Sequence, residues 1–123
     1  MTTSAIFMAL LGLSASFLPQ ELLTYANAEV GRFAVVLVQV TGALYLGFAF
    51  LNWMARGVLI GGIYSRPLAL GNFMHFAVVT TVLAKVLVTE FSLFTMAGVS
   101  IYAVFAMWFA LVLFTHPLGT NSD

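Results

Sequence analysis

Residues 33–55, FAVVLVQVTGALYLGFAFLNWMA, contain no charged side chain and only a few polar ones. A helix needs about 20 mostly apolar residues to cross the ~30 Å hydrocarbon core of a bilayer. The hydrocarbon core excludes charged side chains more strongly than any others. A charge-free apolar stretch of this length predicts a transmembrane helix. The stretch therefore indicates a membrane protein rather than a water-soluble domain.

The composition of the whole chain agrees with that class. Of the 123 residues, 63% are hydrophobic and 7% are charged, whereas about a quarter of the residues of a soluble domain are charged. A chain this short also has too much surface to bury so many apolar side chains in water. The charged residues leave four charge-free stretches, at 1–20, 33–55, 67–84 and 91–122.

The four stretches predict an all-α membrane protein with four transmembrane helices in an antiparallel bundle. The expected spans are residues 4–18, 31–55, 68–89 and 91–115. No repeat or linker divides the chain, so we expect residues 1–123 to form a single four-helix transmembrane domain.

The first span and the residues after it leave two points open. Ala26-Asn27-Ala28 has the small-x-small pattern of a signal-peptide cleavage site, but no Lys or Arg precedes the apolar run. Retention of residues 1–28 is therefore favoured over their removal. Pro19 suits the first position of a helix, and Glu21 would face the positive end of its dipole. A short helix along the membrane interface and a plain loop both fit residues 20–28.

The second span contains small residues that predict close helix packing. Ala43 and Gly47 lie four positions apart, a spacing that lets two helices approach closely in lipid. We expect this pair to form a helix-packing surface.

The positions of Lys and Arg predict the orientation in the membrane. The connection between the second and third spans carries Arg56 and Arg66, whereas the first carries Arg32 and the third Lys85. Since cytoplasmic loops carry the excess of basic residues, we expect the second connection and both chain termini to be cytoplasmic.

Several chemistries find no support in the sequence. The four basic and four acidic residues cancel, so no electrostatic argument favours a nucleic acid or an anionic membrane surface as the main partner. The chain has no cysteine and no GxSxG, HExxH or P-loop motif. Its two histidines, His75 and His116, are not accompanied by further strong metal ligands. We therefore expect no metal and no cofactor, and we expect that the protein is not an enzyme.

One group of polar side chains forms a candidate ligand-binding site. The short connection 56–66 makes the second and third spans antiparallel neighbours, so polar residues near it should share the cytoplasmic side. Two guanidinium groups can hold a phosphate or carboxylate, and amide or imidazole groups can orient it. The candidate residues are Asn52, Arg56, Arg66, Asn72 and His75.

Each of these side chains also has a structural explanation. The two arginines could be topology signals that contact lipid phosphates. The two asparagines could form hydrogen bonds between helices. His75 could be a hydrogen-bonded structural histidine, although its intramembrane position raises the expectation of a function.

The same region carries a resemblance. Residues 52–57 (NWMARG), 61–67 (GGIYSRP) and 71–76 (GNFMHF), together with Phe17-Leu18-Pro19, resemble segments of small, uncharacterised four-helix integral membrane proteins of bacteria. The resemblance covers roughly half of the chain. It implies a four-helix fold and a location in a bacterial inner membrane, and it implies no established activity.

Three functional hypotheses follow. The first is a non-enzymatic membrane protein whose partners are membrane lipids and that binds a lipid-like or amphipathic anionic ligand in a polar funnel between the second and third spans. The second is a small oligomeric transporter or channel in which His75 relays protons. The third is an accessory subunit that packs against a larger membrane complex through Ala43, Gly47 and the aromatic fourth span.

Overall fold

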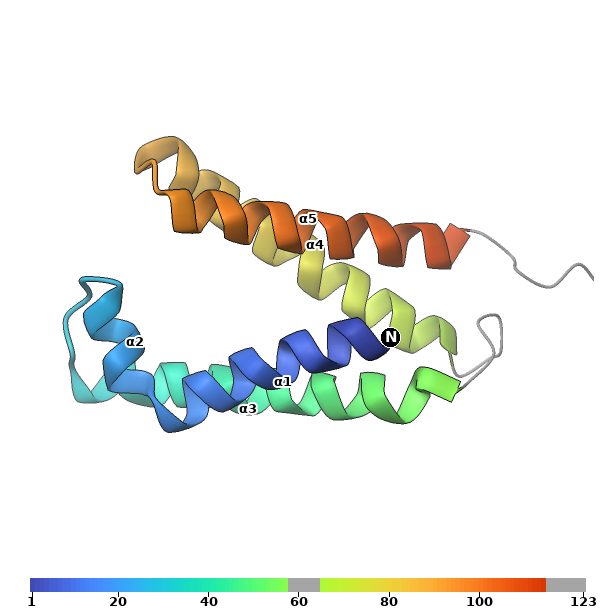
Figure 1. Cartoon of the computed structure of the whole chain (residues 1–123), viewed down its shortest axis with the longest axis horizontal. Helices are drawn as coiled ribbons and strands as arrows, with labels where there is room; N and C mark the ends of the chain where they lie inside the picture. Colours follow the sequence, from blue (N-terminus) through green and yellow to red (C-terminus); the bar gives the residue numbers. More distant parts are fainter. Residues whose placement is uncertain (58–64, 115–123) are drawn as a thin grey trace, which may run out of the picture. The chain divides into compact units, whose positions relative to one another are not determined.

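The computed structural model describes residues 1–57 and 65–114, except for the side chain of residue 65. Within these ranges the chain is helical without any β-strand (Figure 1). The predicted all-α class is confirmed. The helices are α1 (Thr2–Phe17), α2 (Pro19–Tyr25), α3 (Arg32–Met54), α4 (Ser65–Thr89) and α5 (Leu93–Phe114), and the 3₁₀ turn η1 (Ala55–Gly57) extends α3.

Three of these helices are long and apolar enough to cross a membrane: α3 with its 3₁₀ turn, α4 and α5. Helices α1 and α2 pass the same test only together, as a pair bent by 97°. Alone, α1 has 16 residues and is ~24 Å long, which is shorter than the ~30 Å core of a bilayer. The helices agree with the expected spans to within a few residues at each end.

Helix α2 is a short helix with defined ends rather than a plain loop. Pro19 opens it in the first turn, where a missing N–H costs no hydrogen bond. At its other end Asn27 has a φ of 52°, and the N–H groups of Asn27 and Ala28 donate to the carbonyl oxygens of Thr24 and Leu23. This is the Schellman arrangement that ends a helix on a left-handed residue.

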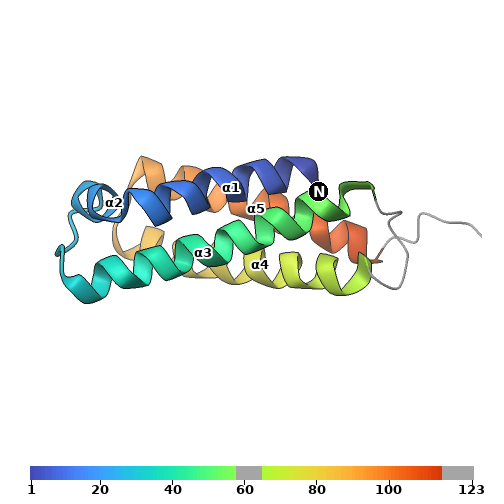
Figure 2. The ribbon, with the colours of Figure 1, turned by 90° about the horizontal axis from the view of Figure 1, so that it is seen from below.

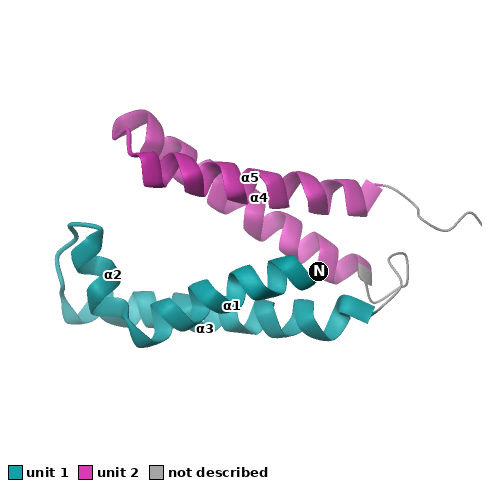
Figure 3. Ribbon diagram, viewed as in Figure 1, with its two compact units in different colours: residues 1–57 teal, residues 58–123 magenta. Residues whose placement is uncertain are grey.

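Residues 1–57 form one compact unit (Figure 3), in which α1 and α3 lie side by side (Figure 2). A Cβ atom on Gly42 would lie 2.7 Å from the backbone nitrogen of Ser16 and 2.9 Å from the carbonyl oxygen of Gly12. One turn before Gly12 on α1, Met8 contacts Asn52. The order of these contacts shows that α1 and α3 are antiparallel.

The contact between α1 and α3 does not use Ala43 and Gly47, whose packing role stays a prediction. Ala43 is exposed, and a Cβ atom on Gly47 would meet nothing within 4 Å. The close approach uses Gly42 instead, one position before Ala43. A shift of one position turns the contact by about 100° around the helix, so the predicted pair lies on another face.

Residues 58–123 form the second compact unit, whose described helices α4 and α5 make a hairpin. Its centre is Phe76, which is fully buried. The ring of Phe76 stacks on Phe105 with centroids 4.8 Å apart and on Phe109 with centroids 5.7 Å apart. Since Leu83 meets Gly98 further along the pair, these helices are antiparallel as well. The single four-helix domain stays a prediction.

Candidate functional site

Asn52 lies near the C-terminal end of α3 and is fully buried. Its Nδ2 donates to the Sδ atom of Met8 on α1, at 3.7 Å, and Met8 is fully buried too. An amide that leaves water for an apolar surrounding is unfavourable unless it is hydrogen-bonded. Asn52 therefore links α3 to α1 in addition to any role toward a ligand.

Arg56 lies one turn beyond Asn52, in the 3₁₀ turn η1, and is exposed. Its Nη1 donates to the carbonyl oxygen of Trp53 at 2.8 Å, one of the carbonyl groups that a helix leaves without an internal partner at its C-terminus. Its guanidinium carbon lies 4.0 Å from the centroid of the Trp53 ring, a cation–π contact. Within residues 1–57 and 65–114 no carboxylate pairs with Arg56.

The other three candidate residues lie on α4. Arg66 is in the first turn and is exposed. Asn72 is fully buried, and its Nδ2 donates to the carbonyl oxygen of Leu68 in the preceding turn at 2.9 Å. His75 is half-buried and meets the ring of Phe76 edge-on, with centroids 5.3 Å apart.

Both units show the same arrangement: an exposed arginine lies at the end of a helix, and a buried asparagine lies farther from that end on the same helix. In the first unit Arg56 is followed inward by Asn52, about 6 Å along the axis. In the second, Arg66 is followed inward by Asn72 and His75, about 9 Å and 14 Å along the axis. The structure thus groups the five residues as one pair and one trio, and the meeting of these two sets remains a prediction. Residues 58–64 of the predicted connection and His116 lie outside the described residues.

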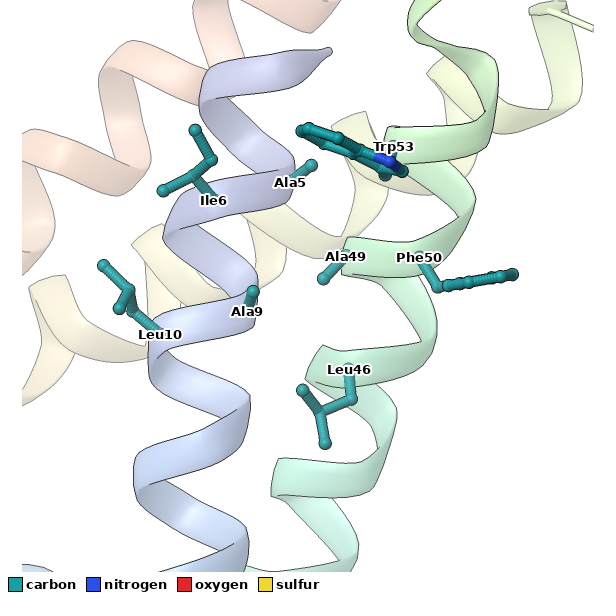
Figure 4. Close-up of a pocket in the computed structure, with 8 residues that line it drawn as sticks. All are labelled: Ala5, Ile6, Ala9, Leu10, Leu46, Ala49, Phe50 and Trp53. Atoms are coloured by element: carbon teal, nitrogen blue, oxygen red, sulfur yellow. The ribbon is translucent and has the colours of Figure 1, made fainter.

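An apolar groove in the first unit was not foreseen from the sequence. It has a volume of about 410 Å³, and its lining comes from α1 and α3 alone (Figure 4). Trp53, on which Arg56 stacks, is part of that lining. The spacing of Ala5 and Ala9, four positions apart on α1, is the signal that could have indicated it, because small residues at this spacing leave room on one helix face. The lining residues are Ala5, Ile6, Ala9, Leu10, Leu46, Ala49, Phe50 and Trp53.

Two further findings bear on the site. In the described part of the chain, no three His, Asp or Glu side chains lie close enough together to hold a metal ion. Comparison of the sequence and structure with protein-family models, with curated proteins and with solved structures gives no match.

Proposed function

We propose that the protein is an integral membrane protein of a bacterial inner membrane, in which α1 with α2, α3, α4 and α5 form an antiparallel four-helix bundle with both termini in the cytoplasm. The support is the surface of the helices. Large apolar side chains are more than half exposed on each of them, for example Leu10, Leu44, Val82 and Val104. Monomeric soluble proteins rarely expose apolar surface of this extent, whereas helices that satisfy their own backbone hydrogen bonds can face lipid.

Within this fold the proposed activity is binding of an amphipathic anionic ligand, without catalysis. Arg56 and Arg66 hold the anionic group, while Asn52, Asn72 and His75 orient it. The observation that carries this proposal is the state of Arg56. Among the described residues, one of its five N–H donors binds the carbonyl oxygen of Trp53, and its guanidinium carbon lies 4.0 Å from the centroid of the Trp53 ring. Since Arg56 is exposed, its other donors can bind a phosphate or carboxylate.

The test is native mass spectrometry of the full chain purified in mild detergent. We expect a bound anionic lipid or lipid-like molecule, and we expect a double variant, Arg56→Ala with Arg66→Ala, to lower its occupancy by about tenfold or more, since a hydrogen bond to a charged group contributes ~1.5–3 kcal/mol. The matched control is a second double variant, Arg32→Ala with Lys85→Ala, which removes two exposed cations that lie away from the proposed site. Equal occupancy in both double variants would contradict the proposal.

A second candidate function is packing against a larger membrane complex or a second copy of the chain. One observation favours it. Ala43 is exposed and a Cβ atom on Gly47 would meet nothing within 4 Å, so this small-residue face of α3 is available to another helix. Gly47→Leu should then break the assembly and leave the monomer folded, as seen by light scattering in detergent. A transporter would instead show pH-dependent solute flux in proteoliposomes that is lost in His75→Gln.

A further inference from the structure

The apolar groove on the first unit has a floor of small residues and a rim of large ones (Figure 4). The methyl groups of Ala5 and Ala9 on α1 and of Ala49 on α3 point into the space between the two helices (Figure 4). Ala5 and Ala49 are buried, while the rim residues Leu10 and Phe50 are exposed. The groove is therefore closed behind by the helix pair and open toward the surroundings.

The groove is also elongated along α3. Its lining on α3 extends from Leu46 to Trp53, which corresponds to ~10 Å along the helix axis. A volume of about 410 Å³ falls within the ~300–1,000 Å³ of pockets that hold small organic ligands. Every lining residue is apolar, so the groove suits a hydrocarbon chain that lies along the helix pair.

The end of the groove at Trp53 carries a positive charge. Trp53 is the last lining residue on α3, and the guanidinium carbon of Arg56 lies 4.0 Å from the centroid of its ring. Trp side chains are enriched where the hydrocarbon core meets the headgroup region, which suits a position near the end of a spanning helix. An apolar groove that ends at an exposed cation is complementary to a molecule with one apolar chain and one anionic group.

We propose that the groove holds an acyl chain of an anionic phospholipid from the surrounding bilayer, and that Arg56 binds the phosphate of the same molecule. This inference rests on the proposed function and deepens it, because it names the ligand class and assigns the acyl chain to the α1–α3 face. A zwitterionic phospholipid with the same acyl chains fits the groove equally well but lacks the net negative charge. The preference for the anionic lipid should be about fivefold, the effect of one basic residue near the membrane surface.

Fluorescence of Trp53 gives a direct readout of the groove. The chain has two tryptophans, Trp53 and the exposed Trp108, so Trp108→Phe leaves Trp53 as the sole reporter. This protein is reconstituted in phosphatidylcholine vesicles that contain a small fraction of either phosphatidylglycerol or phosphatidylcholine with brominated acyl chains. Bromine quenches tryptophan on contact. We expect quenching by the brominated phosphatidylglycerol at about fivefold lower mole fraction.

Two variants separate the parts of the site. Arg56→Gln, which removes the positive charge of an exposed side chain, should make the two brominated lipids equally effective. Ala9→Leu should fill the groove and weaken quenching by both lipids. Two controls are matched to these variants. Arg32→Gln makes the same change at the other end of α3 and should leave the preference unchanged. Trp53→Phe leaves only Trp108, which should report no preference.

The outcomes distinguish the groove from the proposed function. Equal quenching by both lipids in the Trp108→Phe protein, or a preference that survives Arg56→Gln, overturns the groove proposal. If in that case the ligand seen by native mass spectrometry still depends on Arg56 and Arg66, the proposed function stands without the groove. If Trp53 reports an Arg56-dependent preference while the Arg56→Ala/Arg66→Ala protein keeps its ligand in native mass spectrometry, the groove stands and the wider five-residue site is wrong.

Discussion

Gly12 of α1 and Gly42 of α3 face each other so closely that neither position has room for a side chain. A Cβ atom on Gly42 would lie 2.9 Å from the carbonyl oxygen of Gly12, and one on Gly12 would lie 3.0 Å from the carbonyl oxygen of Gly42. In lipid, where apolar burial supplies no drive for two helices to associate, such backbone approach lets dispersion and polar contacts hold the pair together. The α1–α3 pair also carries the groove and the link between Asn52 and Met8.

The first prediction tests this glycine contact. Gly42→Ala places a methyl group against the backbone of Ser16 and Gly12, so it should destabilise the protein by about 1–3 kcal/mol, the usual range for overpacking. The measurement is unfolding by sodium dodecyl sulfate titration in mixed micelles, followed by circular dichroism. Gly47→Ala is the matched control on the same helix and should change stability by less than ~1 kcal/mol, because its methyl group meets nothing within 4 Å. Equal losses in both variants would contradict the role of Gly42.

The second prediction concerns the hydrogen bond from Asn52 to Met8. A double-mutant cycle of Asn52→Leu and Met8→Leu should give a coupling energy of about 0.5–1 kcal/mol, the range measured for polar contacts between transmembrane helices. A control cycle pairs Asn52→Leu with Met54→Leu, at an exposed methionine two positions from Asn52. It should give no coupling energy, because side chains two apart on a helix do not face each other. Additive effects of Asn52→Leu and Met8→Leu would show that the amide does not depend on the thioether.

The third prediction concerns the aromatic centre of the second unit. Phe76 is fully buried and stacks on Phe105 and Phe109, so Phe76→Ala should leave a cavity and lower stability by about 3 kcal/mol or more. Phe114→Ala removes the same atoms from a side chain that is 82% exposed and should change stability by only ~0.5 kcal/mol. If the exposed site were as sensitive as the buried one in the same unfolding titration, the ring stack would not be the core of this unit.

The fourth prediction concerns the 97° bend between α1 and α2. If α1 crosses the bilayer from a cytoplasmic N-terminus, α2 lies along the opposite surface of the bilayer. The chain has no cysteine, so a single introduced cysteine is a unique label. Thr24→Cys on α2 should react with a membrane-impermeant maleimide on intact cells, whereas Leu44→Cys within α3 should not react. Gly57→Cys, at the cytoplasmic end in the proposed orientation, should react only after the membrane is opened. Labelling of Gly57→Cys from outside would reverse the orientation.

Much of the fold was predictable because length and charge are local properties. The charge-free residues 33–55 correspond to α3 (Arg32–Met54), and α1, α4 and α5 correspond to the other three charge-free stretches. The reason is physical. A long apolar segment can satisfy its backbone hydrogen bonds without water only as a helix, so composition and length suffice to place it. Pro19 allowed a helix start at this point because a proline fits the first turn of a helix, but a plain loop was equally compatible with the sequence of residues 20–28.

The faces of the helices were not predictable in the same way. A helix that is apolar all round has no polar stripe to show how it is rotated about its axis. The choice among Gly42, Ala43 and Gly47 as the contact with α1 therefore had no basis in α3 alone. It depends on Gly12 and Ser16, about thirty residues earlier in the chain, and only tertiary packing brings these backbones together.

The candidate site was likewise predictable in part from the sequence and dependent in part on tertiary structure. Local sequence identified Asn52, Arg56, Arg66, Asn72 and His75 as polar residues in or beside apolar spans, because such residues stand out from the rest of the composition. Tertiary structure showed that Asn52 contacts Met8. It also showed that Ala5, Ala9 and Ala49 leave a groove that ends at Trp53, the residue on which Arg56 stacks. The contact between Asn52 and Met8 joins side chains 44 residues apart, and the groove brings residues of α1 beside residues of α3. They depend on how two helices are turned toward each other, which neither helix encodes alone.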